Sequence, residues 1–149
     1  MTSAIMPTYA PADIAFEHGE GVYLYSTDGK KYVDFGSGIA VSALGHSHPH
    51  LVAAIQEQAG KVMHYSNLYR IPGQETLAQR LVDNSFASSV FCTNSGAEAV
   101  ECGLKIVRRY HDVNGNPDKY RVITCTGSFH GRTLATLSAA KNEKHMDGF

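Results

Sequence analysis

Two short segments combine residue types that could bind a phosphorylated ligand. The first, NSGAE at 94–98, lies between an apolar run and an amphipathic helical pattern. The first amides of a helix have no partner inside the helix, and the helix dipole leaves partial positive charge there. Because Gly96 and Ala97 are small, an anion could approach these amides closely. The same residues also fit a capping box, in which Ser95 caps the helix and Glu98 reaches back to the Ser95 amide.

The second segment, TGSFHGRT at 126–133, directly follows an apolar run. Phe129 could stack on a flat ring, and the planar guanidinium of Arg132 could bind a carboxylate. Taken alone, a core phenylalanine and a solvated surface arginine are the more ordinary interpretation. In a parallel α/β sheet, however, ligands bind outside the carboxyl ends of the strands, where both segments would lie. Together the two segments predict a site for a phosphorylated aromatic cofactor and an acidic substrate.

The surrounding pattern predicts the elements that would position these residues. The β-rich runs 22–25 and 31–35 flank Asp28-Gly29, a pair that favours a hairpin. Apolar spacing and helix-start residues predict helices at about 49–62, 72–83 and 96–111, with a helix or irregular segment after Arg132. The runs 89–93 and 120–125 are predicted to be buried strands of a parallel βαβ unit, whose free cysteines Cys92 and Cys125 would lie in the core.

Composition limits the class of protein. The chain has 149 residues, 43% apolar and 18% charged, with a net charge of −1, as in an ordinary globular domain. No basic stripe suggests nucleic acid, and no apolar run approaches the roughly 20 residues of a membrane span. The N-terminus does not resemble a secretory or transit signal. Three cysteines without a C-x-x-C pair argue against a disulfide framework. We therefore expect a cytoplasmic protein.

Two other patterns are weaker than they first look. The segment GSGIAV at 36–41 has valine where a dinucleotide fingerprint needs its third glycine. Three histidines alternate at positions 46, 48 and 50, without the spacing of a helical metal pair. We expect turn and cap roles for these histidines, and no metal.

Three segments in order resemble one family, the class III pyridoxal-phosphate-dependent aminotransferases. They are SGIAVSALGHSHPHLVAAI, NSGAEAVECGLKIVRRY and GSFHGRTLATLSAA, and the resemblance runs from about Val22 to Phe149. It implies an α/β protein of the fold type I, aspartate-aminotransferase-like class. Residues 1–62 would be an N-terminal segment belonging to the small domain, and 63–149 the start of an incomplete large domain that binds pyridoxal 5'-phosphate.

The resemblance also implies a role for each site residue. Gly96 and Ala97 would contact the cofactor phosphate through their backbone, with Ser95 beside them. Phe129 would stack on the pyridine ring, and Arg132 would bind the substrate carboxylate. The family members are homodimers with the active site at the subunit interface.

The branch of the family that the chain resembles acts on N-acetylornithine and glutamate or 2-oxoglutarate, in arginine biosynthesis. Ile39 is weak support for this branch, because ornithine-type members tend to carry tyrosine there. Ornithine, succinylornithine and 4-aminobutyrate transaminases remain alternatives, as does a mutase. A non-catalytic module that binds a phosphate ligand is a further alternative.

The family's Schiff-base lysine and its acidic partner for the pyridine nitrogen would lie beyond Phe149. No catalytic residue is therefore predicted in this chain, which should be inactive alone although its parent protein is an enzyme. Two strands are also too few for a parallel sheet, which indicates the front portion of a larger protein. We expect exposed apolar surface, and either aggregation or dependence on a partner chain.

Overall fold

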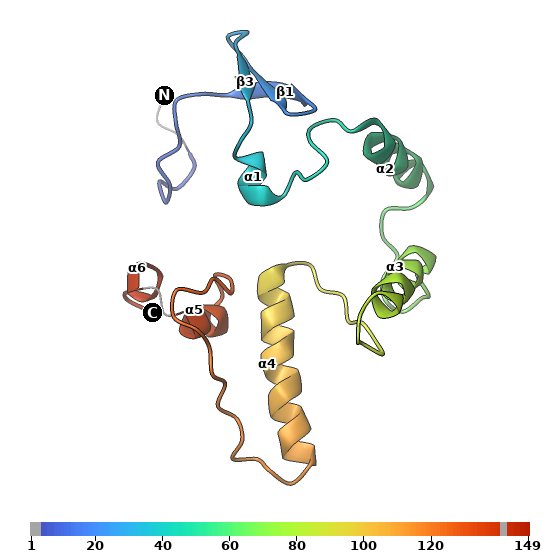
Figure 1. The fold of residues 1–149 in the computed structure, drawn as a ribbon, viewed down its shortest axis with the longest axis vertical. Helices are drawn as coiled ribbons and strands as arrows, with labels where there is room; N and C mark the ends of the chain where they lie inside the picture. Colours follow the sequence, from blue (N-terminus) through green and yellow to red (C-terminus); the bar gives the residue numbers. More distant parts are fainter. Residues whose placement is uncertain (1–3, 141–142) are drawn as a thin grey trace. The chain divides into compact units, whose positions relative to one another are not determined.

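The structure, a computed structural model, describes residues 4–140 and 143–149. The chain forms two compact units, Met1–Arg70 and Ile71–Phe149, and each is described by itself (Figure 1). These units are defined by contacts within this chain. The domain boundary predicted after residue 62 concerns the complete protein and stays a prediction.

The first unit contains a three-stranded antiparallel sheet. Its strands are β1 (Phe16–Glu20), β2 (Tyr23–Ser26) and β3 (Lys31–Val33), in the order β1-β2-β3. The predicted hairpin is confirmed as β2–β3, and Gly29 supplies the positive φ of 81° that its turn requires. The strand β1 was not predicted, because its sequence FEHGE has no alternation of apolar and polar residues.

Two helical segments follow this sheet. The element α1 (Ser37–Ala40) is a tight turn in which all four residues have positive φ, between 46° and 65°. The element α2 (Pro49–Lys61) is a regular helix that begins at a proline, as predicted. No residue of α2 is buried, and its predicted apolar stripe is open to solvent, with Ile55 59% exposed.

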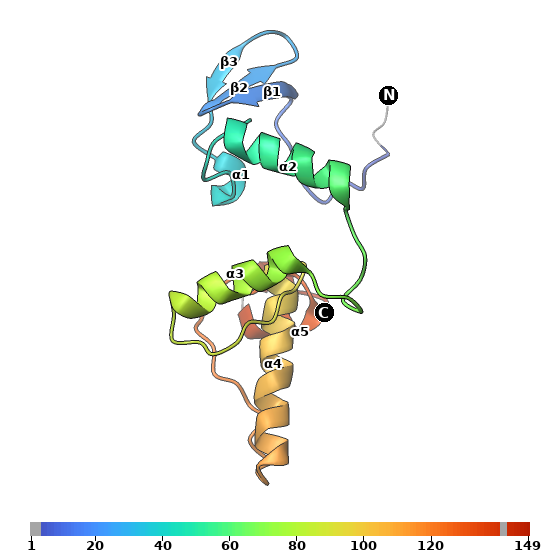
Figure 2. The ribbon, with the colours of Figure 1, turned by 90° about the vertical axis from the view of Figure 1, so that its right-hand side faces the viewer.

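The second unit is helical. It contains α3 (Pro72–Asp83), α4 (Gly96–Val113), α5 (Leu134–Ala140) and α6 (Glu143–Met146), and α5 packs against α4 (Figure 2). The predictions of α3 and α4 are confirmed at nearly the predicted bounds. In each case a residue suited to a helix start is present, proline within α3 and a serine cap before α4.

The two predicted strands of the βαβ unit are wrong for this chain. Residues 89–93 and 120–125 form no regular secondary structure, and no backbone hydrogen bond joins the two segments within the described ranges. Instead, the second segment returns along α4 (Figure 1). A strand exists only with a hydrogen-bonded neighbour, and neither segment finds one here. Cys92 and Cys125, predicted to be core residues, are consequently exposed.

Exposed apolar surface is the main feature of both units. The accessible surface is 13120 Å², whereas a folded monomer of 16.2 kDa exposes about 7,500 Å². Among the described residues, Leu137 and Ala140 are the buried hydrophobic side chains. The predicted excess of exposed apolar surface is therefore confirmed.

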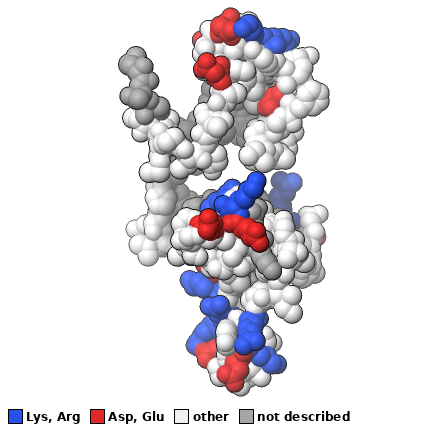
Figure 3. All heavy atoms as spheres, turned by 90° about the vertical axis from the view of Figure 1, so that its left-hand side faces the viewer, with Lys and Arg blue, Asp and Glu red and all other residues white. Residues whose placement is uncertain are grey.

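Charged side chains are mixed on the surface. On the face drawn in Figure 3, acidic and basic groups are interspersed, in keeping with the net charge of −1. A membrane-crossing helix would need a longer apolar stretch than any helix in the described part of the chain provides.

Candidate functional site

The N-terminus of α4 is capped by its own side chains. Ser95 has extended backbone angles, and its Oγ accepts a hydrogen bond from the Glu98 amide at 3.2 Å. The carboxylate of Glu98 accepts from the Asn94 amide at 2.8 Å. The predicted capping box is therefore shifted by one residue, since we expected Glu98 to bond the Ser95 amide. Asn94 lies one residue farther from the helix than Ser95, and the Glu98 side chain is long enough to reach its amide.

This cap leaves the next two amides unused. The amides of Gly96 and Ala97 have no hydrogen-bond partner in the described part of the structure. The space beside Gly96 is also open, since a Cβ atom added there would meet no heavy atom within 4 Å. Two free N–H groups at the positive end of an 18-residue helix fit an anionic oxygen. The residues present therefore suit the phosphate that the sequence predicted for them.

The second predicted segment packs directly on this helix end. Gly131 is buried with φ of 132°, and a Cβ atom added to it would lie 2.6 Å from Cβ of Ala97. Only glycine allows this close approach at that backbone angle. The two segments predicted to converge therefore lie side by side, although the parallel sheet used to predict their convergence is absent from this chain.

Phe129 and Arg132 lie on the open side of this loop. Phe129 is 69% exposed, which rules out the alternative that it is a core residue in this chain. The guanidinium carbon of Arg132 lies 5.4 Å from the centroid of the Phe129 ring, within cation–π range. The ring is thus available for stacking, and the arginine fork is held next to it.

A hydrogen bond that sequence reasoning missed joins this loop to α4. The hydroxyl of Thr133 donates to Oε1 of Glu101 at 2.5 Å. Glu101 and Lys105 lie four residues apart on α4, but no ion pair between them occurs among the described residues. Helical spacing reveals only partners on the same helix, whereas this partner lies 32 residues away. The available hint was a threonine at the last position of the predicted ligand segment 126–133.

In the first unit, the histidine-rich loop is held by an ion pair. Nε2 of His46 lies 2.7 Å from Oδ2 of Asp34, and Oδ1 of Asp34 accepts from the amides of Gly36 and Ser37. The hydrogen bond with His46, followed by that from the Ser37 amide, lowers the pKa of Asp34 below its ordinary value of 3.8. His48 precedes Pro49 at the start of α2, in the predicted cap position, but its side chain makes no capping bond. No cluster of three metal-binding side chains occurs in the described ranges.

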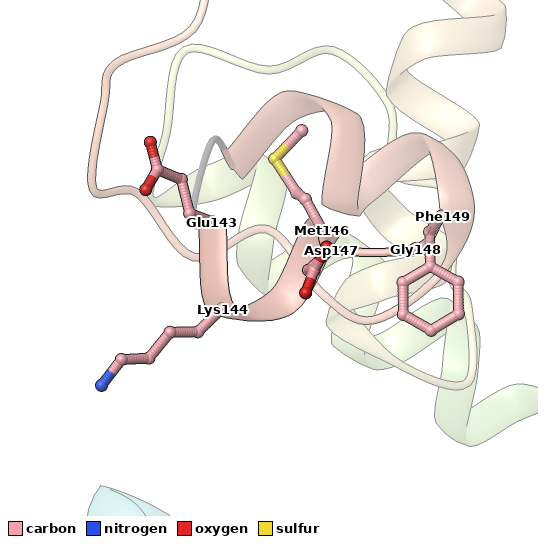
Figure 4. A pocket seen from close by; sticks show the side chains of 6 residues that line it. All are labelled: Glu143, Lys144, Met146, Asp147, Gly148 and Phe149. Atoms are coloured by element: carbon pink, nitrogen blue, oxygen red, sulfur yellow. The ribbon is translucent and has the colours of Figure 1, made fainter.

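In the described part of the second unit, the hollows include one beside α6 and one along α4. One is lined by the residues of α6 and those that follow it, and its polar side chains do not converge on a point (Figure 4). The other is an apolar groove along α4, where residues 122–124 face Val100, Leu104 and Val107. Neither hollow contains the free amides of α4. The candidate site is therefore the helix end together with the loop 127–133.

Comparison with known proteins identifies the family. The aminotransferase class III family matches residues 5–149, and the chain belongs to that family. Acetylornithine aminotransferase of Mesorhizobium japonicum is 60% identical over 147 residues, covering 99% of this chain and 37% of the relative. The chain therefore spans about a third of the length of this curated relative.

Solved structures agree with this assignment. N-acetylornithine aminotransferase of Stenotrophomonas maltophilia is 44% identical with a TM-score of 0.74, over 81% of this chain and 34% of that one. The ornithine aminotransferase of Toxoplasma gondii, described with partial occupancy of pyridoxal phosphate at its active site, is 27% identical with a TM-score of 0.90. That match covers 98% of this chain and 35% of the other. The chain thus has part of the α/β fold type I of pyridoxal-phosphate-dependent transferases.

Proposed function

We propose that the full-length protein carrying this sequence is a pyridoxal-phosphate-dependent aminotransferase. Its reaction would move the side-chain amino group of N-acetylornithine to 2-oxoglutarate, a step of arginine biosynthesis. The observation that carries the proposal is the pair of free amides at Gly96 and Ala97, in a chain 60% identical to an acetylornithine aminotransferase. Ornithine, succinylornithine and 4-aminobutyrate are the competing substrates.

Each site residue has a defined role in this proposal. Gly96 and Ala97 donate backbone hydrogen bonds to the cofactor phosphate, while Ser95 keeps the helix end in shape. Phe129 stacks on the pyridine ring, and Arg132 binds the substrate carboxylate through its planar fork. When bound, the cofactor serves as the electron sink that makes amino-group transfer possible. The residues of this chain bind and orient, and the lysine that moves the proton is proposed to come from the remainder of the protein.

The proposal includes two features of the complete protein. We infer a homodimer, because the resemblance to class III aminotransferases implies one with the active site at the subunit interface. We also infer a cytoplasmic location, since the three cysteines are unpaired.

The direct test uses the purified full-length protein with pyridoxal 5'-phosphate. Addition of N-acetylornithine should change the visible absorption of the bound cofactor, and 2-oxoglutarate should restore it with formation of glutamate. The same titration with the three competing substrates ranks them by kcat/KM. A protein whose cofactor spectrum responds to none of these amino acids, nor to glutamate, would disprove the proposed activity. A stronger response to 4-aminobutyrate than to N-acetylornithine would make 4-aminobutyrate the proposed substrate, with the family unchanged.

The role of Arg132 has a narrower test. Arg132→Ala should raise the KM for N-acetylornithine by about tenfold or more, because a charge-assisted hydrogen bond contributes about 1.5–3 kcal/mol. Arg80→Ala, on the exposed side of α3, is the matched control and should leave KM unchanged. An unchanged KM in Arg132→Ala would remove this arginine from the substrate site.

A further inference from the structure

Glu101 makes an unusual contact for a glutamate on a helix surface. It lies in the second turn of α4, and its carboxylate accepts the hydroxyl proton of Thr133 at 2.5 Å. A glutamate on a helix surface would ordinarily be solvated or paired with a basic side chain one turn away, and Glu101 is half-buried. Here it reaches across to the loop that carries Phe129 and Arg132. A hydrogen bond to an ionised acceptor is among the stronger ones in a protein.

Thr133 is the point at which this loop becomes α5. Its hydroxyl also lies 3.0 Å from Oγ1 of Thr136, a side chain with no exposed surface. The carbonyl of Thr133 accepts a hydrogen bond from the Thr136 hydroxyl at 2.9 Å and another from the Leu137 amide at 2.8 Å. Thr133 is therefore fixed on one side to the start of α5 and on the other to α4.

The loop 127–133 is thus attached to α4 at two neighbouring points. Gly131 is pressed against Ala97 in the first turn, and Thr133 is bonded to Glu101 in the second. Arg132 lies between these points, and Phe129 lies two residues before the first. Because the loop has no other side-chain hydrogen bond to α4 in the described residues, loss of the second point would let it pivot about Gly131.

We propose that Glu101 is a positioning residue, which acts through Thr133 to fix the ring-stacking and carboxylate-binding side chains relative to the free amides of α4. The proposal rests on the proposed function, because it supposes that one ligand spans the helix end and the loop. Glu101 itself touches neither the cofactor nor the substrate.

The first test needs no cofactor. Hydrogen exchange is measured by mass spectrometry on the full-length protein without pyridoxal 5'-phosphate. Glu101→Ala and Thr133→Val should each raise exchange about tenfold at the Leu137 amide, which donates to the Thr133 carbonyl, as expected for loss of a bond to an ionised acceptor. Thr133→Ser keeps the hydroxyl and should exchange like the native protein. Lys105→Ala, one turn along α4 from Glu101, is the matched control and should also show native exchange.

The second test measures the consequence for binding. Glu101→Ala should weaken the binding of pyridoxal 5'-phosphate about tenfold, measured by absorbance titration. Adding Thr133→Val to Glu101→Ala should weaken binding no further, because the two substitutions remove the same hydrogen bond. Glu101→Gln keeps an uncharged acceptor, so its affinity for pyridoxal 5'-phosphate should lie between those of the native protein and Glu101→Ala, with a loss of about threefold. This variant still tests the proposal if Glu101→Ala fails to fold.

Two results would overturn the proposal. One is native exchange at the Leu137 amide in both Glu101→Ala and Thr133→Val. The other is an equal rise in exchange within α3, which would indicate general loss of stability. If the native protein fails to bind pyridoxal 5'-phosphate, the proposed function fails, but the exchange comparison still decides whether Glu101 holds the loop.

Discussion

Gly131→Ala is the substitution for which the structure sets the sharpest expectation. The new Cβ would lie 2.6 Å from Cβ of Ala97, 2.9 Å from Oγ1 of Thr136 and 3.0 Å from Cα of Ala97. Carbon atoms pack best at about 3.5–4.0 Å, so the loop must move away from α4 by about 1 Å. Overpacking of this kind costs about 1–3 kcal/mol. A φ of 132° adds a backbone cost of about 1–3 kcal/mol for any residue with a Cβ.

Gly127→Ala separates these two contributions. Gly127 lies in the same loop with φ of 78°, but a Cβ atom added there meets nothing within 4 Å. It should therefore lose about 1–2 kcal/mol, from the backbone alone. Gly131→Ala should lose more than this, because a packing contribution of about 1–3 kcal/mol is added to its own backbone cost.

The assay is urea unfolding of the full-length protein, together with titration of pyridoxal 5'-phosphate. Ala97→Gly placed in the Gly131→Ala background removes the shortest of the three clashes and should recover at least about 1 kcal/mol as a favourable coupling. Cofactor affinity should fall in Gly131→Ala and partly return in the double variant. Equal losses in Gly131→Ala and Gly127→Ala, or no coupling with Ala97→Gly, would refute the close packing of this loop on α4.

Two further predictions concern the helix cap and the ion pair. Ser95→Ala should destabilise the start of α4 by about 1 kcal/mol, seen as faster amide exchange at Glu98, whose N–H bonds Ser95. Ser95→Asp should keep the cap but weaken the binding of pyridoxal 5'-phosphate by charge repulsion. Equal cofactor affinity in Ser95→Ala and Ser95→Asp would argue against a phosphate at this helix end. The lowered pKa of Asp34 contributes stability that is present above pH 3.8 and is lost as pH falls through the folded-state pKa. Asp34→Asn should therefore flatten the acid side of a urea-stability profile, and an unaltered acid slope would exclude the ion pair with His46 as its cause.

Elements with a local cause could be predicted from the sequence. The β2–β3 hairpin follows from Asp28-Gly29, because a positive φ is needed at the turn and glycine supplies it. The helices α2 and α3 begin at prolines, and α4 begins after a serine whose side chain caps it. In each case the deciding interaction lies within a few residues of the element that it determines.

Elements that depend on distant partners could not be predicted in the same way. Residues 89–93 and 120–125 have the apolar character of strands, but a strand also needs neighbours that composition does not supply. The strand β1 exists through its pairing with β2, and its Gly19 packs on His46, where an added Cβ would lie 2.6 Å from Cγ of that ring.

The candidate site shows the same division. Convergence of the helix end and the loop was predicted from topology, and the structure brings the two segments together at Gly131 and Ala97. The Thr133–Glu101 bond was missed because it joins residues on different elements. The roles of Ser95, Gly96, Ala97, Phe129 and Arg132 toward a ligand remain predictions.

The turn α1 raises a question of natural selection. Ile39 has φ of 65° and is 94% exposed, so a β-branched residue holds a left-handed conformation without burying its side chain. The left-handed region costs about 1–2 kcal/mol for such a residue, and glycine would adopt it freely. Selection for the stability of this unit alone would favour Ile39→Gly. If function rather than stability maintains Ile39, a deep mutational scan should show that Ile39→Gly accumulates well as folded protein but supports growth less well than the native residue.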